Sequence, residues 1–126
     1  LAPFTQLAAL AALQRPEVQR YKDQMLLAYS ARREILAAVS QNTWLGRNLT
    51  LPQGAFYSLV NISDWKMNSL EAAQELVSRQ GISLTPGRAF GENMDQYLRL
   101  CFAIEDSQLL KALDGLQFFG SELHGN

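Results

Sequence analysis

From Glu17 to Ser40 the sequence contains neither glycine nor proline, the two residues that most often interrupt a helix. One set of side chains recurs along this run at spacings of three and four, which is the period of one face of an α-helix. Glu17 suits the first turn, where the helix dipole favours negative charge. The run therefore predicts one long amphipathic helix. Its stripe consists of Val18, Tyr21, Met25, Tyr29, Arg32, Leu36 and Val39.

Shorter elements are predicted on both sides of this helix. Residues 4–14 form an alanine-rich helical pattern that Pro16 ends. Residues 49–51 and 55–60 are rich in strand-forming side chains, and the composition of residues 52–54, Pro-Gln-Gly, is that of a tight turn. The two segments therefore predict a β-hairpin.

The middle of the chain carries the signals of a capped helix. Asn68 can cap its N-terminus, Glu71 stands where a capping box requires it, and Gly81 suits a left-handed C-terminal cap. We expect a short strand over Ile82–Thr85 and then a loop over Pro86–Asn93. The expected buried stripe of the helix consists of Leu70, Ala73, Leu76 and Val77.

The clearest strand in the sequence is Tyr97–Ile104, because apolar residues occupy every second position. Asp106 can cap a last helix, which Gly120 would end. The expected buried side of that helix consists of Leu109, Leu110, Leu113 and Leu116. The order of elements predicts an α+β fold, in which a small, mainly antiparallel sheet is packed with helices and preceded by the long helix.

Composition narrows the classes of function. A chain of 126 residues that is 48% hydrophobic and 18% charged has enough apolar material for one globular core. The formal net charge of −1 argues against a nucleic-acid partner, and no apolar run approaches the length of a membrane span. Cys101 and His124 are the only cysteine and histidine. The sequence therefore predicts no internal disulfide, no metal site, and a reducing compartment such as the cytoplasm.

Arg99 is the strongest single candidate for a binding residue. It lies in the middle of the predicted strand, on the face opposite Leu98 and Leu100. A guanidinium group beside a sheet core is costly unless it is paired, and its fork of donors suits a carboxylate. The alternatives are an arginine on a solvated sheet face or one paired with a local acid.

The segment from Pro86 to Gly91 is a second candidate. Its two glycines would let the backbone approach a ligand closely, or would only make a tight connection. It lacks the spacing of a phosphate-binding motif. Cys101 shares the predicted face of Arg99, but no histidine is near it in the sequence, so we expect an inert, packed cysteine.

Several segments together resemble one family. Residues 51–57, Leu-Pro-Gln-Gly-Ala-Phe-Tyr, resemble the P-x-G-A-F-Y segment of class I/II aminotransferases. The family's G-V-x-x-x-P-G-x-x-F-G loop and R-L-x-F-A strand are similar to Gly81–Gly91 and Tyr97–Ala103. The alanine-rich helix that precedes this domain in the family resembles Gln6–Leu13. The resemblance covers essentially the whole chain, in matching order and spacing.

The resemblance implies a pyridoxal-phosphate-dependent enzyme of fold type I, which moves an amino group between an amino acid and a 2-oxo acid. Family members are usually homodimers, in which a large domain supplies the lysine that binds the cofactor. The small domain supplies an arginine that binds the substrate α-carboxylate, and Arg99 occupies that motif position. The long helix would link the two domains. The residues expected near the active-site mouth are Pro86, Gly87, Phe90 and Gly91.

The same resemblance implies two parts in this chain. Residues 1–15 would be a helix left from the junction with the large domain, and residues 16–126 the C-terminal small domain. The chain begins at Leu1 rather than at methionine, and we expect the missing large domain to lie upstream. No segment around Lys22, Lys66 or Lys111 resembles the family's cofactor-lysine motif. We therefore expect this chain alone to bind no pyridoxal phosphate and to be inactive.

Two other functions stay open at this point. Some transcription regulators carry an aminotransferase-like domain as a ligand sensor, fused to a DNA-binding module. The other alternative is a free-standing α+β interaction module, in which Arg99 is structural. Within the enzyme fold, relatives also include lyases, synthases and decarboxylases, which a small domain barely distinguishes.

Overall fold

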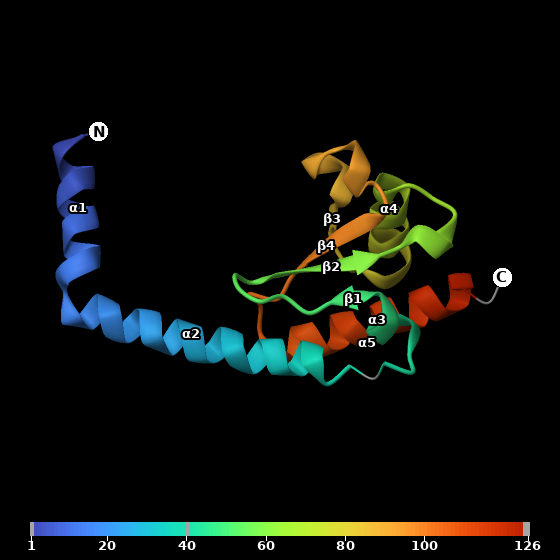
Figure 1. The fold of residues 1–126 in the computed structure, drawn as a ribbon, viewed down its shortest axis with the longest axis horizontal. Coiled ribbons are helices and arrows are strands. Elements are labelled where there is room, and N and C mark those ends of the chain that lie inside the picture. The colour runs from blue at the N-terminus through green and yellow to red at the C-terminus, as the bar shows by residue number, and fades with distance from the viewer. Residues whose placement is uncertain (1, 40, 125–126) are drawn as a thin grey trace. The chain divides into compact units, whose positions relative to one another are not determined.

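The computed structural model describes residues 2–39 and 41–124 of the chain. Two compact units make up the chain, Leu1–Ala31 and Arg32–Asn126, and the division between them falls within one helix. The first unit is helical, whereas the second contains every strand of the described residues (Figure 1).

The first unit consists of helix α1 (Pro3–Gln14) and the N-terminal part of helix α2 (Pro16–Ala37). Proline is tolerated at the start of each helix, because the first helical positions need no backbone N–H donor. Both predicted helices are confirmed. Helix α2 ends at Ala37, somewhat before the predicted end, and Ser40 lies outside the described residues.

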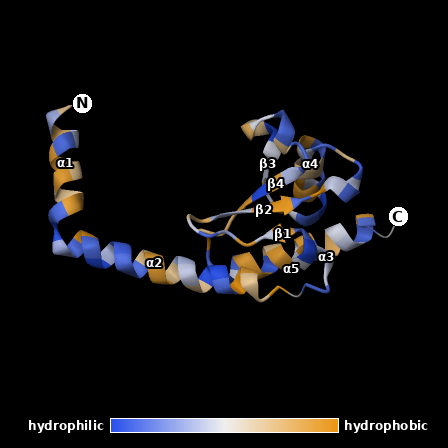
Figure 2. Ribbon diagram, viewed as in Figure 1, coloured by the Kyte–Doolittle hydropathy of each residue, from blue (hydrophilic) through white to orange (hydrophobic). Residues whose placement is uncertain are grey.

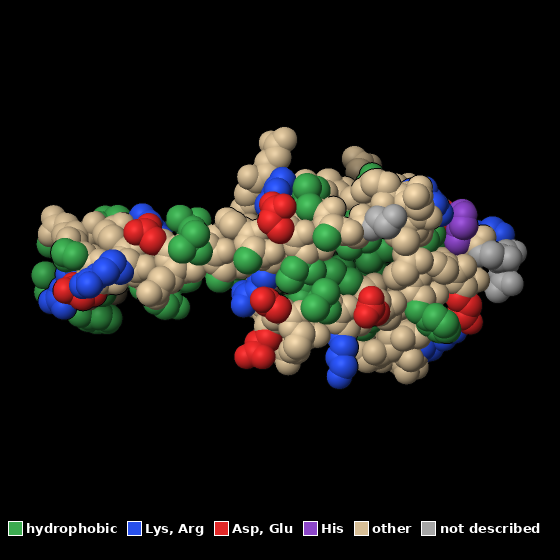
Figure 3. All heavy atoms as spheres, turned by 90° about the horizontal axis from the view of Figure 1, so that it is seen from below, with side chains coloured by type: hydrophobic (Ala, Val, Ile, Leu, Met, Phe, Trp, Pro, Cys, Tyr) green, Lys and Arg blue, Asp and Glu red, His purple; other side chains and the backbone are tan. Residues whose placement is uncertain are grey.

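The apolar side chains of the first unit are not buried within it. Helix α1 has no buried residue among those described, although much of it is hydrophobic (Figure 2). In the space-filling view, hydrophobic and charged side chains are interspersed on the surface of this unit (Figure 3). Its large exposed apolar side chains are Phe4, Leu7, Leu10, Leu13, Tyr21, Leu26 and Leu27.

The second unit contains a four-stranded antiparallel sheet in the order β1-β2-β4-β3. Its strands are β1 (Leu49–Thr50), β2 (Tyr57–Asn61), β3 (Thr85–Pro86) and β4 (Tyr97–Cys101). The α+β class and the predicted hairpin are confirmed. Strand β4 is shorter than predicted, because it extends only as far as its neighbours pair with it. The strand predicted over Ile82–Thr85 was wrong except at Thr85, because only Thr85 and Pro86 pair with β4.

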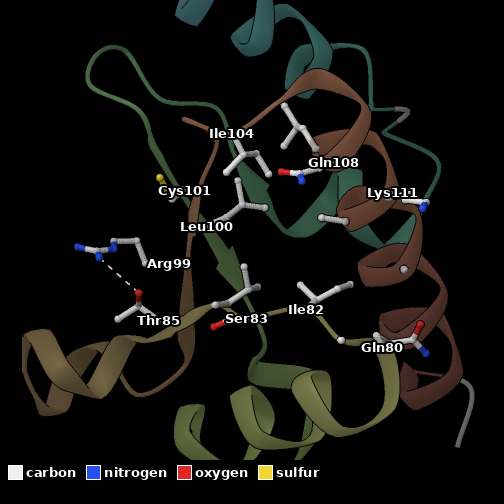
Figure 4. Close-up of a pocket in the computed structure, with 15 residues that line it drawn as sticks. Gln80, Ile82, Ser83, Thr85, Arg99, Leu100, Cys101, Ile104, Gln108 and Lys111 are labelled. Carbon is white, nitrogen blue, oxygen red and sulfur yellow. Dashed lines mark hydrogen bonds between the residues drawn. The ribbon is translucent and has the colours of Figure 1, made fainter.

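The sheet has one buried and one open face. Every second residue of β2 and β4 is buried, as the predicted alternation requires: Ser58, Val60, Leu98 and Leu100. Helices α4 (Ser69–Gln80) and α5 (Asp106–His124) cover this buried face. In the close-up, Leu100 points toward α5, whereas Arg99 points the other way (Figure 4). We call these the helix face and the open face.

Helix α4 begins and ends as predicted. The Asn68 side chain accepts hydrogen bonds from the backbone N–H groups of Leu70 and Glu71, at 3.1 and 3.0 Å. The Glu71 carboxylate accepts from the Asn68 N–H at 3.2 Å, which completes the capping box. Gly81 follows in the left-handed conformation with φ of 67°. Local polar interactions therefore set both ends of this helix.

The buried stripes predicted for α4 and α5 were wrong in part. Leu70 and Val77 are 48% and 52% exposed, whereas Ser69 and Ala72 are buried in their place. In α5, Leu110 is also exposed. Both helices carry apolar residues around more of their circumference than the sheet covers, so packing, and not periodicity, selects the buried side.

Helix α3 (Trp44–Asn48) was not predicted. The Thr43 side chain caps it by accepting a hydrogen bond from the Gly46 N–H at 3.1 Å. The buried Trp44 ring lies against Gly120 of α5, where an added Cβ would collide with the ring. The prediction that Gly120 ends α5 was therefore wrong. This glycine lets α5 pass close to Trp44, and the helix continues to His124.

Short 3₁₀ turns lie in some of the connections: η1 (Ser63–Trp65), η2 (Gly87–Phe90) and η3 (Glu92–Met94). Trp65 of η1 stacks on Trp44 with a centroid distance of 5.0 Å and meets the edge of Phe119 at 5.1 Å. These aromatic contacts tie α3, η1 and α5 together. Across residues 2–39 and 41–124, no helix is both long and apolar enough to cross a membrane.

Candidate functional site

Arg99 lies in the middle of β4, on the open face of the sheet. Its partner across one side is Leu59 of β2, and its partner across the other side is Thr85 of β3. Cross-strand partners share a face, so three strands together surround the Arg99 side chain. The sequence predicted the strand and the face, but it did not identify which residues would meet Arg99.

Among the described residues, the guanidinium group has one hydrogen-bond partner and two aromatic neighbours. Its Nη2 donates to the Thr85 hydroxyl oxygen at 3.3 Å. Its Cζ lies 4.2 Å from the ring centroid of Tyr57 and 4.6 Å from that of Phe90. Both distances are within the range of cation–π attraction, which favours a charge held close to the rings.

No carboxylate balances this charge among the described residues. Arg32 pairs with Asp106 at 2.8 Å and Arg79 pairs with Glu122, but no described acidic side chain is within ion-pair distance of Arg99. Its Nε is buried without a hydrogen-bond partner in the described part of the chain. A half-buried guanidinium with unused donors is suited to binding a carboxylate through two parallel hydrogen bonds.

Of the four predicted loop residues, Phe90 contacts Arg99, whereas the two glycines and Pro86 shape the backbone. Phe90 reaches Arg99 with its ring and is still 52% exposed. Gly87 is buried, and a Cβ there would collide with the backbone carbonyls of Met94 and Tyr97. Gly91 has φ of 134°, a conformation that favours glycine, and Pro86 belongs to β3. The glycines therefore shape the loop that presents Phe90.

A polar contact between α4 and η3 fixes the same loop. The buried Ser69 donates to one Asp95 carboxylate oxygen from its hydroxyl at 2.7 Å and from its backbone N–H at 3.1 Å. The Ser69 hydroxyl in turn accepts from the Arg88 N–H of η2 at 3.2 Å. We call these three residues the Ser69–Asp95 clasp. No sequence motif signalled it, because its members are distant in the chain.

The clasp also lowers the pKa of the Asp95 carboxyl group. The Ser69 hydroxyl bond lowers the pKa of Asp95 below its ordinary value of 3.8, because it stabilises the ionised carboxylate. The Ser69 backbone N–H lowers the pKa further, partial burial acts in the opposite direction, and the Arg88 charge adds a lesser lowering. Asp95 is thus held in its charged form by the contacts that it makes to the loop.

Neither Cys101 nor His124 is among the described contacts of the Arg99 guanidinium group. Cys101 is an exposed free thiol on the open face, opposite Tyr57 in the register, so the prediction of a packed cysteine was wrong. His124 instead contacts the Asp64 carboxylate at 2.9 Å, which also accepts from the Trp44 indole N–H at 2.8 Å. The described residues contain no cluster of His, Cys, Asp or Glu that could hold a metal ion.

A cavity of about 630 Å³ lies on the helix side of the sheet, between the β3 segment and α5. Its wall is mainly apolar and includes Ile82, Leu84 and Ile104, with Lys111 as a charged residue. Arg99 and Thr85 also line this cavity, but the Arg99 guanidinium group points away from α5 (Figure 4). The cavity therefore adjoins the strand that carries Arg99, whereas the guanidinium group faces the other side of the sheet.

The described residues do not compose a site for pyridoxal phosphate. Such a site needs a lysine beside an anion-binding cradle and an acidic partner for the ring nitrogen. Lys111 lines the apolar cavity, which has no acidic residue in its wall. Lys66 borders a hollow with Glu71, Glu92 and Asp95, whose carboxylates would repel a phosphate. Lys22 lies exposed on α2.

Comparison with known proteins identifies close relatives of the whole segment. A family model described as aminotransferase class I and II matches residues 2–116. An aspartate aminotransferase of Pyrococcus horikoshii is 30% identical over 117 residues, which are 93% of this chain and 30% of that protein. An LL-diaminopimelate aminotransferase of Dehalococcoides mccartyi is 31% identical over 117 residues, 93% of this chain and 29% of its own length.

Solved structures share the fold. The crystal structure of an aminotransferase from Mycobacterium tuberculosis matches with a TM-score of 0.76 and 28% identity, over 96% of this chain and 30% of that chain. The matched segment is therefore a minor part of each relative. The chain spans about 30% of the length of the relatives that it resembles.

Proposed function

The chain belongs to the class I and II aminotransferases, and we propose that it is the C-terminal domain of a pyridoxal-phosphate-dependent enzyme that transfers an amino group between an amino acid and a 2-oxo acid. The relatives named above as aspartate and LL-diaminopimelate aminotransferases support this reaction class. We propose further that the full-length protein is a cytoplasmic homodimer, and that its large domain holds the cofactor.

In this proposal Arg99 binds the α-carboxylate of the substrate. The observation that carries it is a guanidinium group on the open face with no described carboxylate partner, although three other arginines of the same unit have one. An arginine left without an internal counter-ion gains most from an external one. Two parallel hydrogen bonds to a carboxylate would both neutralise the charge and set the orientation of the substrate.

The contribution of this chain is anchoring, and not proton transfer. Pyridoxal phosphate, when bound in the full-length enzyme, supplies the electron sink for the reaction. Arg99 would hold one end of the substrate, so that the amino or oxo group at the neighbouring carbon meets the cofactor in a fixed geometry. The rings of Tyr57 and Phe90 would keep water from part of the guanidinium group and strengthen its hold on the carboxylate.

The test compares Arg99→Ala with Arg79→Ala in the full-length enzyme. Both substitutions remove an arginine that lies beside an aromatic ring, but Arg79 already pairs with Glu122. We expect Arg99→Ala to lower kcat/KM by roughly two orders of magnitude, mostly through KM, because it removes a charge-assisted bidentate contact. L-aspartate, L-phenylalanine and LL-diaminopimelate serve as amino donors, with 2-oxoglutarate as acceptor.

Arg99→Lys sharpens this test, because it keeps the charge but loses the planar fork of donors. An intermediate kcat/KM for Arg99→Lys supports bidentate binding. Unchanged kcat/KM in Arg99→Ala, with every donor that is active in the unsubstituted enzyme, would reject the assignment. The isolated chain should show no amino-group transfer with added pyridoxal phosphate, and measurable transfer would contradict the proposed division of labour.

A further inference from the structure

The surroundings of Arg99 leave one edge of its guanidinium group, the edge between Nη1 and Nη2, available to a ligand. Nε is buried and has no partner among the described residues, so a ligand that approaches from solvent does not reach it. Nη2 uses one of its two hydrogens on Thr85. Nη1 has no described partner and is not buried. A carboxylate from outside therefore meets Nη1 and the second hydrogen of Nη2.

Thr85 determines the direction in which that edge points. The guanidinium group is planar and delocalised, so a contact that fixes Nη2 also fixes the direction of Nη1. Thr85 is the direct cross-strand partner of Arg99, and its hydroxyl oxygen lies within hydrogen-bond distance because the register places both side chains on the open face. A hydroxyl can accept from Nη2 and still keep its own hydrogen for another acceptor.

Phe90 and Tyr57 restrict the plane of the group. Their ring centroids lie 4.6 and 4.2 Å from Cζ, and they come from different elements, η2 and β2. Phe90 is held in place through its own turn, which is anchored by the Ser69–Asp95 clasp and by the close packing of Gly87. The long arginine side chain is thus confined by contacts that do not themselves bind a carboxylate.

We propose that Thr85 and Phe90 are positioning residues, which hold Arg99 so that it binds the substrate carboxylate end-on, through Nη1 and Nη2. The inference rests on the proposed function, because it assigns orientation to the residues around the carboxylate anchor. Neither residue acts on the reacting atoms. Each lowers the conformational entropy that Arg99 would otherwise lose when the substrate binds.

The first test uses two matched pairs of variants in the full-length enzyme. Thr85→Val keeps the shape and strand propensity of the side chain but removes the acceptor, whereas Thr85→Ser restores the hydroxyl. Phe90→Leu removes the aromatic ring, whereas Phe90→Tyr restores one. We expect Thr85→Val and Phe90→Leu each to raise KM for the amino acid and for the 2-oxo acid by about tenfold, with kcat changed less than threefold, on the order of one lost hydrogen bond or cation–π contact.

A second measurement reports orientation without catalysis. In ¹⁵N-labelled chain 1–126, the Arg99 Nε–H should exchange slowly with water, because Nε is buried. Thr85→Val and Phe90→Leu should speed this exchange by at least about fivefold, and Thr85→Ser and Phe90→Tyr should return it toward the original rate. The assignment of the signal follows from its loss in Arg99→Lys.

The outcomes separate the two claims. An Arg99→Ala enzyme with unchanged kcat/KM overturns the proposed function, whatever the other variants do. An Arg99→Ala enzyme with low kcat/KM, combined with Thr85→Val and Phe90→Leu enzymes of unchanged KM, overturns only the positioning role. The positioning role is also overturned if Arg99 Nε–H exchange is equally fast in the original chain and in both variants. Circular dichroism confirms that each variant is folded before it is compared.

Discussion

The two faces of the sheet are built from the same strands, yet they differ in almost every physical property. On the helix face, Val60, Leu98 and Leu100 are buried under α4 and α5. On the open face, the alternate positions of β4 hold a charged side chain and an exposed thiol, Arg99 and Cys101. One strand therefore supplies core packing with its even-numbered residues and leaves its odd-numbered side chains on the open face.

The difference follows from the geometry of a strand. Successive side chains point to opposite faces, so a single segment such as Tyr97–Cys101 serves both layers without compromise. The helix face must exclude water, and there apolar burial contributes roughly 25 cal/mol per Å². The open face needs a rigid backbone under Arg99, and the hydrogen bonds of β2 and β3 to β4 provide it.

The largest expected effect comes from the helix face. Leu98→Ala should destabilise the chain by about 2–5 kcal/mol, because it leaves a cavity at a fully buried position. The neighbouring Arg99→Ala should lower the free energy of unfolding by only about 1 kcal/mol. It breaks no ion pair with a described residue and removes one hydrogen bond and two ring contacts from a half-exposed side chain. Urea denaturation of both variants measures the contrast. Equal losses would mean that the open face is also structural.

A smaller effect is expected where α5 passes Trp44. Gly120→Ala places a methyl group against the buried indole ring, so we expect a loss of about 1–3 kcal/mol of unfolding free energy. Gly54→Ala is the matched control, because a Cβ there meets nothing within 4 Å. Thermal denaturation followed by circular dichroism compares the two. A Gly120→Ala chain as stable as Gly54→Ala would contradict this packing.

A pH-dependent contribution is expected from the Ser69–Asp95 clasp. The pKa of Asp95 is lowered in the folded chain. As the pH falls toward 3.8, this carboxylate therefore binds a proton in the unfolded chain before it does so in the folded chain. The stabilisation is therefore complete above the ordinary pKa and is lost as the pH falls through the folded-state pKa. Asp95→Asn should remove this part of the acid dependence, which urea midpoints measured from pH 6 down to about pH 2 would reveal. An unchanged acid profile in Asp95→Asn would show that the clasp does not couple to folding.

The smallest effect is expected at Cys101. The thiol is exposed on the open face, so Cys101→Ser should change the free energy of unfolding by less than about 0.5 kcal/mol. The folded chain should react fully with a thiol reagent such as 5,5′-dithiobis(2-nitrobenzoate) without denaturant. A thiol that reacts only after unfolding would show that the open face is covered in solution.

Features set by neighbours in the sequence were predictable. The capping box of Asn68 and Glu71, the left-handed Gly81 and the alternation along β4 all depend on interactions within a few residues, and the structure has each of them. The family motifs around Arg99 likewise lie in single segments. Interactions between neighbouring residues and motif spacing therefore sufficed to predict the fold class and the strand and face of Arg99.

Features set by distant neighbours were not predictable. Periodicity alone left several sides of α4 available, and only packing against the sheet exposed Leu70 and Val77. Gly120 has the residue type of a helix end, yet contact with Trp44 gives it another role. In both cases the deciding partner lies far away in the chain, where a local pattern carries no information about it.

The Arg99 site shows the same division between sequence and tertiary structure. The residue itself, its strand and its face follow from the sequence, because alternation along a strand is a local property. Its surroundings depend on the antiparallel register, which brings Thr85, Phe90 and Tyr57 to one guanidinium group from three separate segments. Sequence by itself determined that an arginine would stand on the open face. Only the tertiary structure decided that it would be oriented there with no carboxylate partner among residues 2–39 and 41–124, because strand pairing determines its neighbours.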